Sequence, residues 1–402
     1  MTSPPAEVVL VADAVFTPEE RLADGWVHVR GTRIATVGSG PLPPGLGAPV
    51  LRLPDAACLA PGFIDLHVHG GGGAQVGPDP HEVGEVAAFH ARYGTTGLLA
   101  TTMPGPENTL METVRAVGAV ARRPSAGAAQ VLGCHLEGPF VSPERPGALD
   151  VRHLRPPDQA ELGRLLDAGG ASVQMIVVAP ELPGALDLVA TAASDGVVVA
   201  IGHTDATYAE ATAGFDRGAR AATHLFNGMR PFHHRDPGPA GAALAAPRVT
   251  AEIIADGIHV HPAALRLAHA AKGPRRLALI TDAMQAAGLE DGDYLLGDQT
   301  VTVTAGEART ASGSLAGSTL TMDRAVRTCV EDAGIPLIDA LQMASTTPAE
   351  LLGLGAVTGR IAPGADASLV VLDETLSAIG TMVCGRWAHC DDALGAVAAP
   401  AA

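Results

Sequence analysis

The sequence predicts an α/β protein in which a closed, TIM-like (β/α)8 barrel carries a small β-sandwich domain built from both chain ends. Eight short apolar runs lie in the middle of the chain, and each precedes a segment with helical spacing or composition, which is typical of parallel βα units. Short β-rich runs broken by turn residues stand at the two ends. The length of 402 residues fits this division, since single cores stop growing near roughly 250–300 residues.

The two chain ends share the same pattern of short strands. Residues 8–53 contain VVLVADAVF, WVHVRGTRIATVG and VLRL, and the segment after Gly359 contains RIAPGADASLVVLD, GTMVCG and RWAH. We therefore expect residues 1–58 and 359–402 to form the small sandwich domain, and residues 59–358 to form the barrel.

The eight apolar runs supply the predicted barrel strands in chain order. They are GFIDLHVH, TGLLATTMP, AQVLGCHLEGP, SVQMIVVAPE, GVVVAIGHT, RAATHLFN, VTAEIIADGIH and RRLALITDAM. Each run ends in polar residues. In a (β/α)8 barrel the carboxyl ends of all strands open on one face, where active sites are assembled from separate strands.

The segments between the runs predict the outer helices. PHEVGEVAAFHARYG, HPAALRLAHAAK and STLTMDRAVRTCVEDAG place alanine and aliphatic residues at spacings of three and four. Residues 291–317, which follow the eighth run, have the pattern of a β-hairpin instead. We expect this hairpin to lie over the open face of the barrel.

The composition excludes several classes of protein. A net charge of −17 disfavours binding to nucleic acid or to an anionic membrane surface. The apolar runs are too short and too interrupted for a membrane span, and no basic residue precedes the first of them, so we expect a cytoplasmic protein without a secretory signal. The five cysteines are odd in number and widely spaced, which predicts free thiols.

Six side chains of the types that bind metals stand at the predicted strand ends. His67 and His69 alternate by two, so in a strand both point to the same face. A His-x-His pair alone is equally typical of two hydrogen-bonded core histidines, and the other four residues favour a metal site. This set of imidazoles and carboxylates suits zinc, iron, manganese or a similar divalent ion. The six residues are His67, His69, Glu137, His203, His224 and Asp282.

Two of these polar residues have a second interpretation, and His259 is a further candidate. Glu137 lies in HLEGP, where a glycine and a proline turn the chain away, so it is either a ligand or a solvated loop residue. Asp282 in LALITDAM is either a general base near the metal or a helix N-cap. His259 in ADGIHVHP is placed to polarise a substrate carbonyl.

Two other types of active site do not fit the sequence. The glycines at 70–73 lack the spacing and the Lys-Ser/Thr ending of a phosphate-binding loop and read as a flexible βα loop. The chain has no Gly-x-Ser-x-Gly motif, which argues against a serine hydrolase.

The strand-end motifs resemble the amidohydrolase superfamily and, within it, the N-acetylglucosamine-6-phosphate deacetylases over nearly the whole chain. The matching motifs occur in the order of that family. They are PGFIDLHVHG, HLEGPF, APE, GHTDATY, THLFNGMRPFHHRDPG, IADGIHVHP, TDAM, GSLAGSTLTMDRAVR and ASTTPAELLGL.

The resemblance implies one or two divalent metal ions per subunit, with zinc or iron ahead of manganese and cobalt. Glu137, His203 and His224 would hold the first ion, and His67 and His69 would hold a second, with Glu137 as the bridge. Many amidohydrolases bridge their ions with a carboxylated lysine. Lys272, the only lysine, follows a helix far from any predicted strand end, so a carboxylate must serve here.

The resemblance also implies hydrolysis of the acetamide of N-acetyl-D-glucosamine 6-phosphate to D-glucosamine 6-phosphate and acetate, in amino-sugar catabolism and cell-wall sugar recycling. Asp282 would take a proton from a metal-bound water, and the resulting hydroxide would attack the acetamide carbon. Asp282 would then protonate the departing amine. His259 would hydrogen-bond the carbonyl oxygen as its charge develops.

For the sugar phosphate, the family pattern points to residues beyond the metal ligands. Arg235 would bind the phosphate, because its planar fork matches phosphate oxygens. A homodimer is implied, in which Arg235 or His234 serves the site of the other subunit. The remaining substrate contacts would be Asn227, Gly228, Ala148, Leu149, Leu315, Ala316 and Gly317.

One departure from the family pattern concerns the sugar. The chain continues from HLEGPF to ERPGALD, so Leu149 stands where a substrate-contacting histidine is usual. Gly228 stands where alanine is common, and a main-chain contact survives that change.

Three alternatives follow from these observations. An N-acetylgalactosamine-6-phosphate deacetylase would share every motif. A cyclic-amide hydrolase such as a dihydroorotase usually needs the bridging lysine that is missing. A catalytically inactive barrel used for assembly has no reason to keep all seven polar residues.

Overall fold

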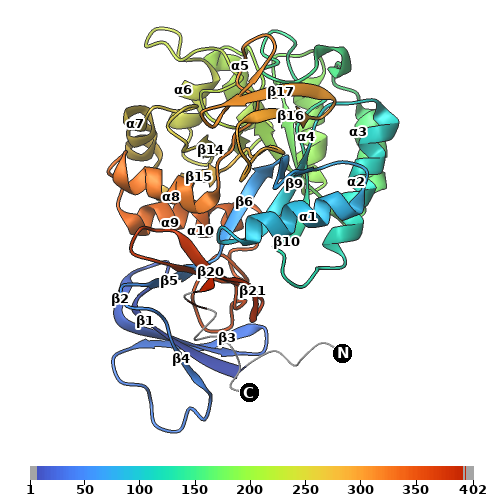
Figure 1. The fold of residues 1–402 in the computed structure, drawn as a ribbon. Helices are drawn as coiled ribbons and strands as arrows, with labels where there is room; N and C mark the ends of the chain where they lie inside the picture. The colour runs from blue at the N-terminus through green and yellow to red at the C-terminus, as the bar shows by residue number, and fades with distance from the viewer. Residues whose placement is uncertain (1–6, 393, 395–402) are drawn as a thin grey trace.

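The computed structural model describes residues 7–392 and residue 394, which form a barrel and a separate small sheet domain (Figure 1). The outermost residues of the predicted sandwich, 1–6, 393 and 395–402, lie outside the described residues. The predicted fold class is confirmed. The exact limits of the two domains stay a prediction.

Eight parallel strands form the barrel. Each lies within one of the eight predicted runs, except that β9 begins one residue before its run, at Thr95. The sheet order is the chain order, and it closes where Val68 bridges Ala283, because His69 N donates to Ala283 O at 2.9 Å. The strands are β6 (Phe63–Val68), β9 (Thr95–Thr102), β10 (Gln130–Leu136), β11 (Val173–Val178), β12 (Val198–Ile201), β13 (Ala221–Ala222), β14 (Thr250–Ile254) and β15 (Leu277–Ile280).

Helices surround the barrel, as the alanine and aliphatic spacing predicts (Figure 1). Side-chain caps fix the start of some of them: Asp79 caps α1 ahead of Pro80, and Thr207 with Glu210 forms a capping box at α5. They are α1 (Pro80–Ala91), α2 (Glu107–Ala121), α3 (Gln159–Gly169), α4 (Ala185–Ser194), α5 (Tyr208–Asp216), α6 (Gly238–Ala245), α7 (Pro262–Lys272), α8 (Met322–Glu331), α9 (Leu337–Ala344) and α10 (Thr346–Leu351). No helix in the described part of the chain is long and apolar enough to cross a membrane.

The small domain joins the two ends of the chain in one eight-stranded sheet. Its centre is β1, which pairs with β2 along its length, with β4 through residues 9–11 and with β5 through residues 14 and 15, so the sheet divides there. The strands are β1 (Glu7–Phe16), β2 (Arg21–Arg30), β3 (Arg33–Ser39), β4 (Val50–Arg52), β5 (Cys58–Pro61), β19 (Leu369–Leu372), β20 (Ala378–Val383) and β21 (Arg386–Cys390).

The insertion after β15 forms a three-stranded antiparallel sheet and therefore has one strand more than the predicted hairpin. Its strands are β16 (Gly292–Leu296), β17 (Gln299–Thr304) and β18 (Glu307–Thr310). The additional turn is Ala305–Gly306, both with positive φ, and an Ala-Gly pair is a weak turn signal in a sequence. The glycine run also differs from the predicted loop, since β7 (Gly70–Gly71) and β8 (Ala74–Gln75) pair there.

Candidate metal centre

The six predicted ligand residues meet at the carboxyl end of the barrel, at or just beyond the ends of five of its strands. His67 lies within β6 and His69 one residue after it, while the others follow β10, β12, β13 and β15. All six are buried, from 0% exposed at His67 to 8% at Asp282. Closure of the barrel brings the first and last strands together, because Asp282 N donates to His67 O at 2.9 Å.

Three of these residues have a backbone conformation that non-glycine residues rarely adopt. His203, His224 and Asp282 have φ values of 45°, 29° and 52°. Such conformations cost about 1–3 kcal/mol each and persist where the surrounding structure fixes them, often at functional sites. The turn after each strand therefore directs these side chains into the barrel mouth.

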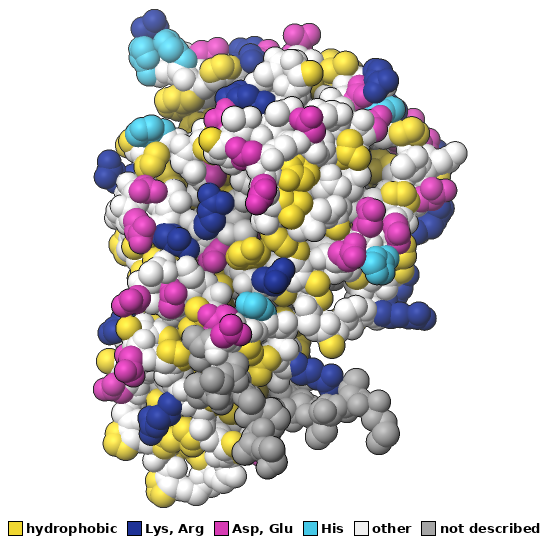
Figure 2. All heavy atoms as spheres, viewed as in Figure 1, with side chains coloured by type: hydrophobic (Ala, Val, Ile, Leu, Met, Phe, Trp, Pro, Cys, Tyr) yellow, Lys and Arg dark blue, Asp and Glu magenta, His cyan; other side chains and the backbone are white. Residues whose placement is uncertain are grey.

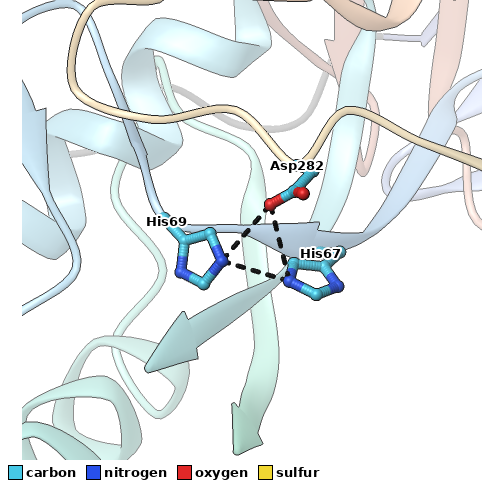
Figure 3. Close-up of side chains that lie close together, drawn as sticks. All are labelled: His67, His69 and Asp282. Atoms are coloured by element: carbon cyan, nitrogen blue, oxygen red, sulfur yellow. Dashed lines mark hydrogen bonds and ion pairs between the residues drawn. The ribbon is translucent and has the colours of Figure 1, made fainter. Parts of the chain in front are cut away.

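The first cluster consists of His67, His69 and Asp282 (Figure 3). The Nε2 atoms of the two histidines lie 3.1 Å apart. Asp282 Oδ1 lies 3.3 Å from His69 Nε2 and 3.6 Å from His67 Nε2. Figure 3 shows the carboxylate above the two rings, with both Nε2 atoms directed toward it.

The second cluster consists of Glu137, His203 and His224. Both histidine Nε2 atoms lie 3.1 Å from Glu137 Oε1 and 3.1 Å from each other.

Glu137 faces both clusters. Besides its contacts in the second cluster, its Oε1 lies 3.3 Å from His67 Nε2 and its Oε2 lies 3.2 Å from His69 Nε2. A carboxylate with both oxygens turned to different imidazole sets is placed to bridge two ions.

The hydrogen bonds of the ring Nδ1 atoms show that this donor set fits cations. A carbonyl oxygen only accepts, so an Nδ1 that contacts one carries the proton, and the Nε2 of the neutral ring is left with a free lone pair. Three of the four rings have such a partner: His69 with Thr101 O at 3.2 Å, His203 with Arg145 O at 2.9 Å and His224 with Asn227 O at 3.0 Å. Lone pairs and carboxylate oxygens that converge in a buried space are the ligands of a divalent ion.

The carboxylates of the centre are held ionised. Burial opposes the charge of Asp282, but the nearby His67 and His69 outweigh it and lower its pKa to about 2. Burial likewise opposes the charge of Glu137, and His67 and His203 shift its pKa well below its usual range.

A buried aspartate ties the first and last barrel strands together beneath the clusters. Asp65 is 0% exposed and accepts hydrogen bonds from Thr281 Oγ1 at 2.5 Å and His67 N at 3.2 Å. Burial raises the pKa of this carboxyl group to about 7. Sequence reasoning missed Asp65, although it lies two residues before His67 and four before His69 and therefore shares their strand face.

His259 lies in the loop after β14 and lines the cavity beside the clusters. Its Nδ1 contacts Asp256 Oδ2 at 2.7 Å, and Asp256 Oδ1 also accepts from His259 N at 2.8 Å. Burial opposes the charged imidazolium, but the hydrogen bond to Asp256 outweighs it and raises the pKa of His259. The pair fixes the ring and leaves its Nε2 for a ligand.

A cavity of about 270 Å³ opens above the two histidine–carboxylate clusters, bounded by the β16–β18 sheet. It includes six of the predicted substrate contacts besides His259: Ala148, Leu149, Asn227, Gly228, Leu315 and Gly317. Met103, Leu296 and Ser314, which sequence reasoning did not identify, line it as well. Among the described lining residues none is an arginine or a lysine.

Two predicted substrate contacts do not line this cavity. Ala316 is 0% exposed and packs with Met284 and Val301 under the β16–β18 sheet. Arg235 is exposed, and its Nη1 contacts His234 Nε2 at 2.9 Å. Figure 2 shows histidine and arginine side chains together at the upper left corner, where the loop before α6 projects in Figure 1.

The side chain of Lys272 donates to main-chain carbonyl oxygens and not to the two clusters. Its Nζ donates to Ala243 O at 2.9 Å and to Ala246 O at 2.7 Å, outside the residues that line the cavity. The amino group of Lys272 is therefore hydrogen-bonded away from the two clusters.

Known proteins are similar to this chain over nearly its whole length. A model of the amidohydrolase family matches residues 58–388. N-acetylgalactosamine-6-phosphate deacetylase of Escherichia coli O157:H7 is 41% identical over 360 residues, covering 88% of this chain and 93% of the relative. N-acetylglucosamine-6-phosphate deacetylase of Bacillus subtilis (strain 168) is 36% identical over 387 residues, covering 95% and 97%.

A solved structure has the same fold. It is a mutant N-acetyl-D-glucosamine-6-phosphate deacetylase of Mycobacterium smegmatis in complex with N-acetyl-D-glucosamine 6-phosphate. It superimposes with a TM-score of 0.90 at 41% identity and covers 96% of this chain and 100% of its own.

Proposed function

This chain belongs to the amidohydrolase family, and on that premise we propose that it hydrolyses the acetamide of N-acetyl-D-glucosamine 6-phosphate to D-glucosamine 6-phosphate and acetate. The observation that carries the proposal is the pair of buried ligand clusters, with Glu137 between them, at the floor of a cavity of about 270 Å³.

Two divalent ions fit the donor set. Glu137, His203 and His224 would hold one, and His67, His69 and Asp282 the other, with Glu137 shared. A bound divalent ion supplies Lewis-acid chemistry: it lowers the pKa of water and polarises a carbonyl oxygen. Zinc or iron leads the candidates because four of the six ligands are imidazoles, while the two carboxylates also admit manganese or cobalt.

Asp282 is the proton carrier of the reaction. Its pKa of about 2 keeps it ionised at neutral pH, so it can accept a proton from the attacking water. The water oxygen bonds to the acetamide carbon, and the C–N bond then breaks. Asp282 returns the proton to the departing amine nitrogen, which leaves acetate and a free amino sugar.

His259 stabilises the charge that develops on the acetamide oxygen. Its raised pKa, caused by Asp256, favours the protonated ring, which can donate from Nε2 toward the cavity. Donors of this kind are worth about 10²–10³ in kcat.

The phosphate site needs a second subunit in this proposal. The described lining of the cavity contains no arginine or lysine, while Arg235 and His234 project from an exposed loop beside Phe232, which is 52% exposed. We therefore propose a homodimer in which Arg235 of the partner subunit binds the phosphate, because a guanidinium fork matches phosphate oxygens.

The compartment proposed for this reaction is the cytoplasm. All five cysteines are free, and three of them are buried. Unpaired thiols are typical of proteins kept in a reducing compartment.

The experiment that tests the proposed function is acetate release from three sugars under identical conditions: N-acetylglucosamine 6-phosphate, N-acetylgalactosamine 6-phosphate and unphosphorylated N-acetylglucosamine. We expect efficient turnover of the first sugar and at least tenfold lower kcat/KM for the other two. Preference for the galactosamine compound would instead assign the chain to the N-acetylgalactosamine-6-phosphate deacetylases. Absence of turnover with all three would overturn the proposed substrate class.

A further inference from the structure

The four histidines of the centre are not held in the same way. Three of them donate from Nδ1 to a main-chain carbonyl oxygen, as described above. His67 is the exception: its Nδ1 is buried and has no hydrogen-bond partner among the described residues. The nearest acidic atom to this Nδ1 is Glu252 Oε2, at 3.6 Å.

Glu252 lies in β14 and is 0% exposed. Both of its carboxylate oxygens are buried and lack a hydrogen-bond partner in the described structure. Burying a carboxylate without a partner is costly, and such groups in native proteins require an explanation. The fold alone gives no reason for a glutamate here, since its neighbours in β14 are Ala251 and Ile253, both fully buried apolar residues.

His135 lies close to both His67 and Glu252, but it cannot donate a hydrogen bond to Glu252. Its Nδ1 contacts Leu66 O at 3.0 Å and therefore carries the proton, so the Nε2 of the neutral ring is an acceptor. One nitrogen of each ring and one carboxylate oxygen lie within 4.8 Å of one another. Between the two rings, only His67 can therefore donate a hydrogen bond to a carboxylate oxygen of Glu252.

We propose that Glu252 is a positioning residue that accepts the Nδ1 proton of His67 and so directs the free Nε2 lone pair of that ring to the metal cluster. It does for His67 what main-chain carbonyls do for the other three histidines. The separation of 3.6 Å is longer than a hydrogen bond, and a shift of roughly 0.5 Å would close it. Carboxylates that orient metal-bound histidines in this way commonly affect metal affinity by about 10–100-fold.

This inference rests on the proposed function only in taking His67 as a ligand. It is specific to one of the two ions, because Glu252 reaches His67 and not the Glu137–His203–His224 cluster. Loss of Glu252 should therefore weaken one ion and leave the other bound.

The test measures zinc binding by Glu252→Leu and Glu252→Gln. The leucine removes both acceptor oxygens and leaves His67 Nδ1 without an acceptor, whereas the glutamine keeps one oxygen that can accept from His67 Nδ1. Elemental analysis after dialysis against graded zinc buffers should give two ions in the wild-type protein. We expect Glu252→Leu to bind the second ion about 10–100-fold more weakly and Glu252→Gln to stay within a few-fold of wild type.

Glu161→Leu is the matched control. Glu161 is another buried glutamate, 4% exposed, and it pairs with Arg155 at 2.6 Å. Neither residue lines the cavity. We expect this variant to lose stability and to keep two ions with wild-type affinity. If both leucine variants lost zinc equally, general destabilisation would explain the weaker binding, and the proposal would be overturned.

A second measurement does not depend on the folding of a variant. Histidine-selective ¹⁵N NMR of the zinc-loaded wild-type protein should show a slowly exchanging, hydrogen-bonded Nδ1–H on His67. Unchanged affinity for both ions in Glu252→Leu, or a His67 ring without that proton, would overturn the proposal. These outcomes are separate from the proposed function: a protein that binds two ions but releases no acetate would remove the function and leave this inference standing.

Discussion

The floor and the rim of the cavity are formed by different structural elements. At the floor, Glu137, His203 and His224 are at most 5% exposed, stand at strand ends and contact one another at 3.1 Å. At the rim, Ala148 and Leu315 come from loops, and the described lining offers no arginine or lysine for an anionic group.

This difference indicates that the chemistry depends on the floor and that the choice of sugar depends on the rim. The strand ends of the floor are joined in one closed sheet, so in our proposal their side chains are already in place for metal before the substrate binds. The rim is made of loops, the β16–β18 sheet and, in our proposal, a second subunit. Substitutions at the floor should therefore abolish metal binding or chemistry, and substitutions at the rim should change which sugar is used.

The largest effect is expected from Glu137→Gln, since this carboxylate contacts both clusters. A neutral amide removes the charge that the imidazoles stabilise, so we expect loss of bound metal and of all measurable turnover. Elemental analysis and acetate release on the same sample check this. Glu144→Gln, at a nearby exposed glutamate, is the control and should retain both. Retention of two ions by Glu137→Gln would refute the role of Glu137 as a bridge.

Asp282→Asn should separate metal binding from chemistry at the same floor. The amide cannot accept a proton, so we expect kcat to fall by about 10²–10⁴-fold. The four histidines and Glu137 remain, so we expect metal to stay bound. Steady-state measurements of acetate release, with metal analysis of the same sample, check this expectation. A variant that keeps more than a tenth of wild-type kcat would contradict the assignment of Asp282 as base.

His259 lies at the border between floor and rim, and we test it with His259→Ala. Removing the donor from the acetamide oxygen should lower kcat by about 10²-fold and change KM much less. His261→Ala is the matched control, because His261 only caps α7 through Ala263 N. An effect of His259→Ala on KM alone would place this residue in substrate binding instead.

Arg235→Ala tests the rim and the proposed dimer together. We expect KM for N-acetylglucosamine 6-phosphate to rise about tenfold or more, as is typical for loss of a charged hydrogen-bond pair. Arg235→Ala should turn over the unphosphorylated sugar at the same slow rate as the wild-type protein. Arg217→Ala is the control: its arginine pairs with Asp187 on the surface, and we expect wild-type KM for both sugars. Equal effects on both sugars would show that Arg235 does not bind the phosphate.

The smallest effect concerns stability against pH. Because Asp256 raises the pKa of His259 in the folded chain, this pair stabilises the fold fully below the ordinary histidine pKa of about 6.5. That contribution is lost as the pH rises through the raised pKa. Urea unfolding of wild-type protein and His259→Ala should therefore differ more at pH 6 than at pH 9. A larger difference at pH 9 would contradict the sign of the shift.

The sequence predicted the floor more completely than the rim, and the reason is physical. Strand periodicity puts His67 and His69 on one face, and barrel closure brings strand ends together, so the six ligand residues could be selected without coordinates. Glu252 and Asp65 were missed because an acid within an apolar strand gives no sign of the partner it meets across the barrel.

At the rim, contacts depend on loop conformation. Ala316 was expected in the cavity and is buried beneath the β16–β18 sheet, because Gly317, with φ of 59°, turns the chain there. The third strand of that sheet depends on the Ala305–Gly306 turn, which composition hardly signals. Leu149, by contrast, does line the cavity.

The most direct test of the account is removal and restoration of metal with turnover followed on the same sample. The protein is treated with a chelator, dialysed and titrated with zinc or iron(II), and acetate release from N-acetylglucosamine 6-phosphate is measured at each metal content. We predict no turnover without metal and full recovery as the clusters fill, to at most two ions per subunit. Undiminished turnover by metal-free protein would contradict the claim that the floor of this barrel is a hydrolytic metal centre.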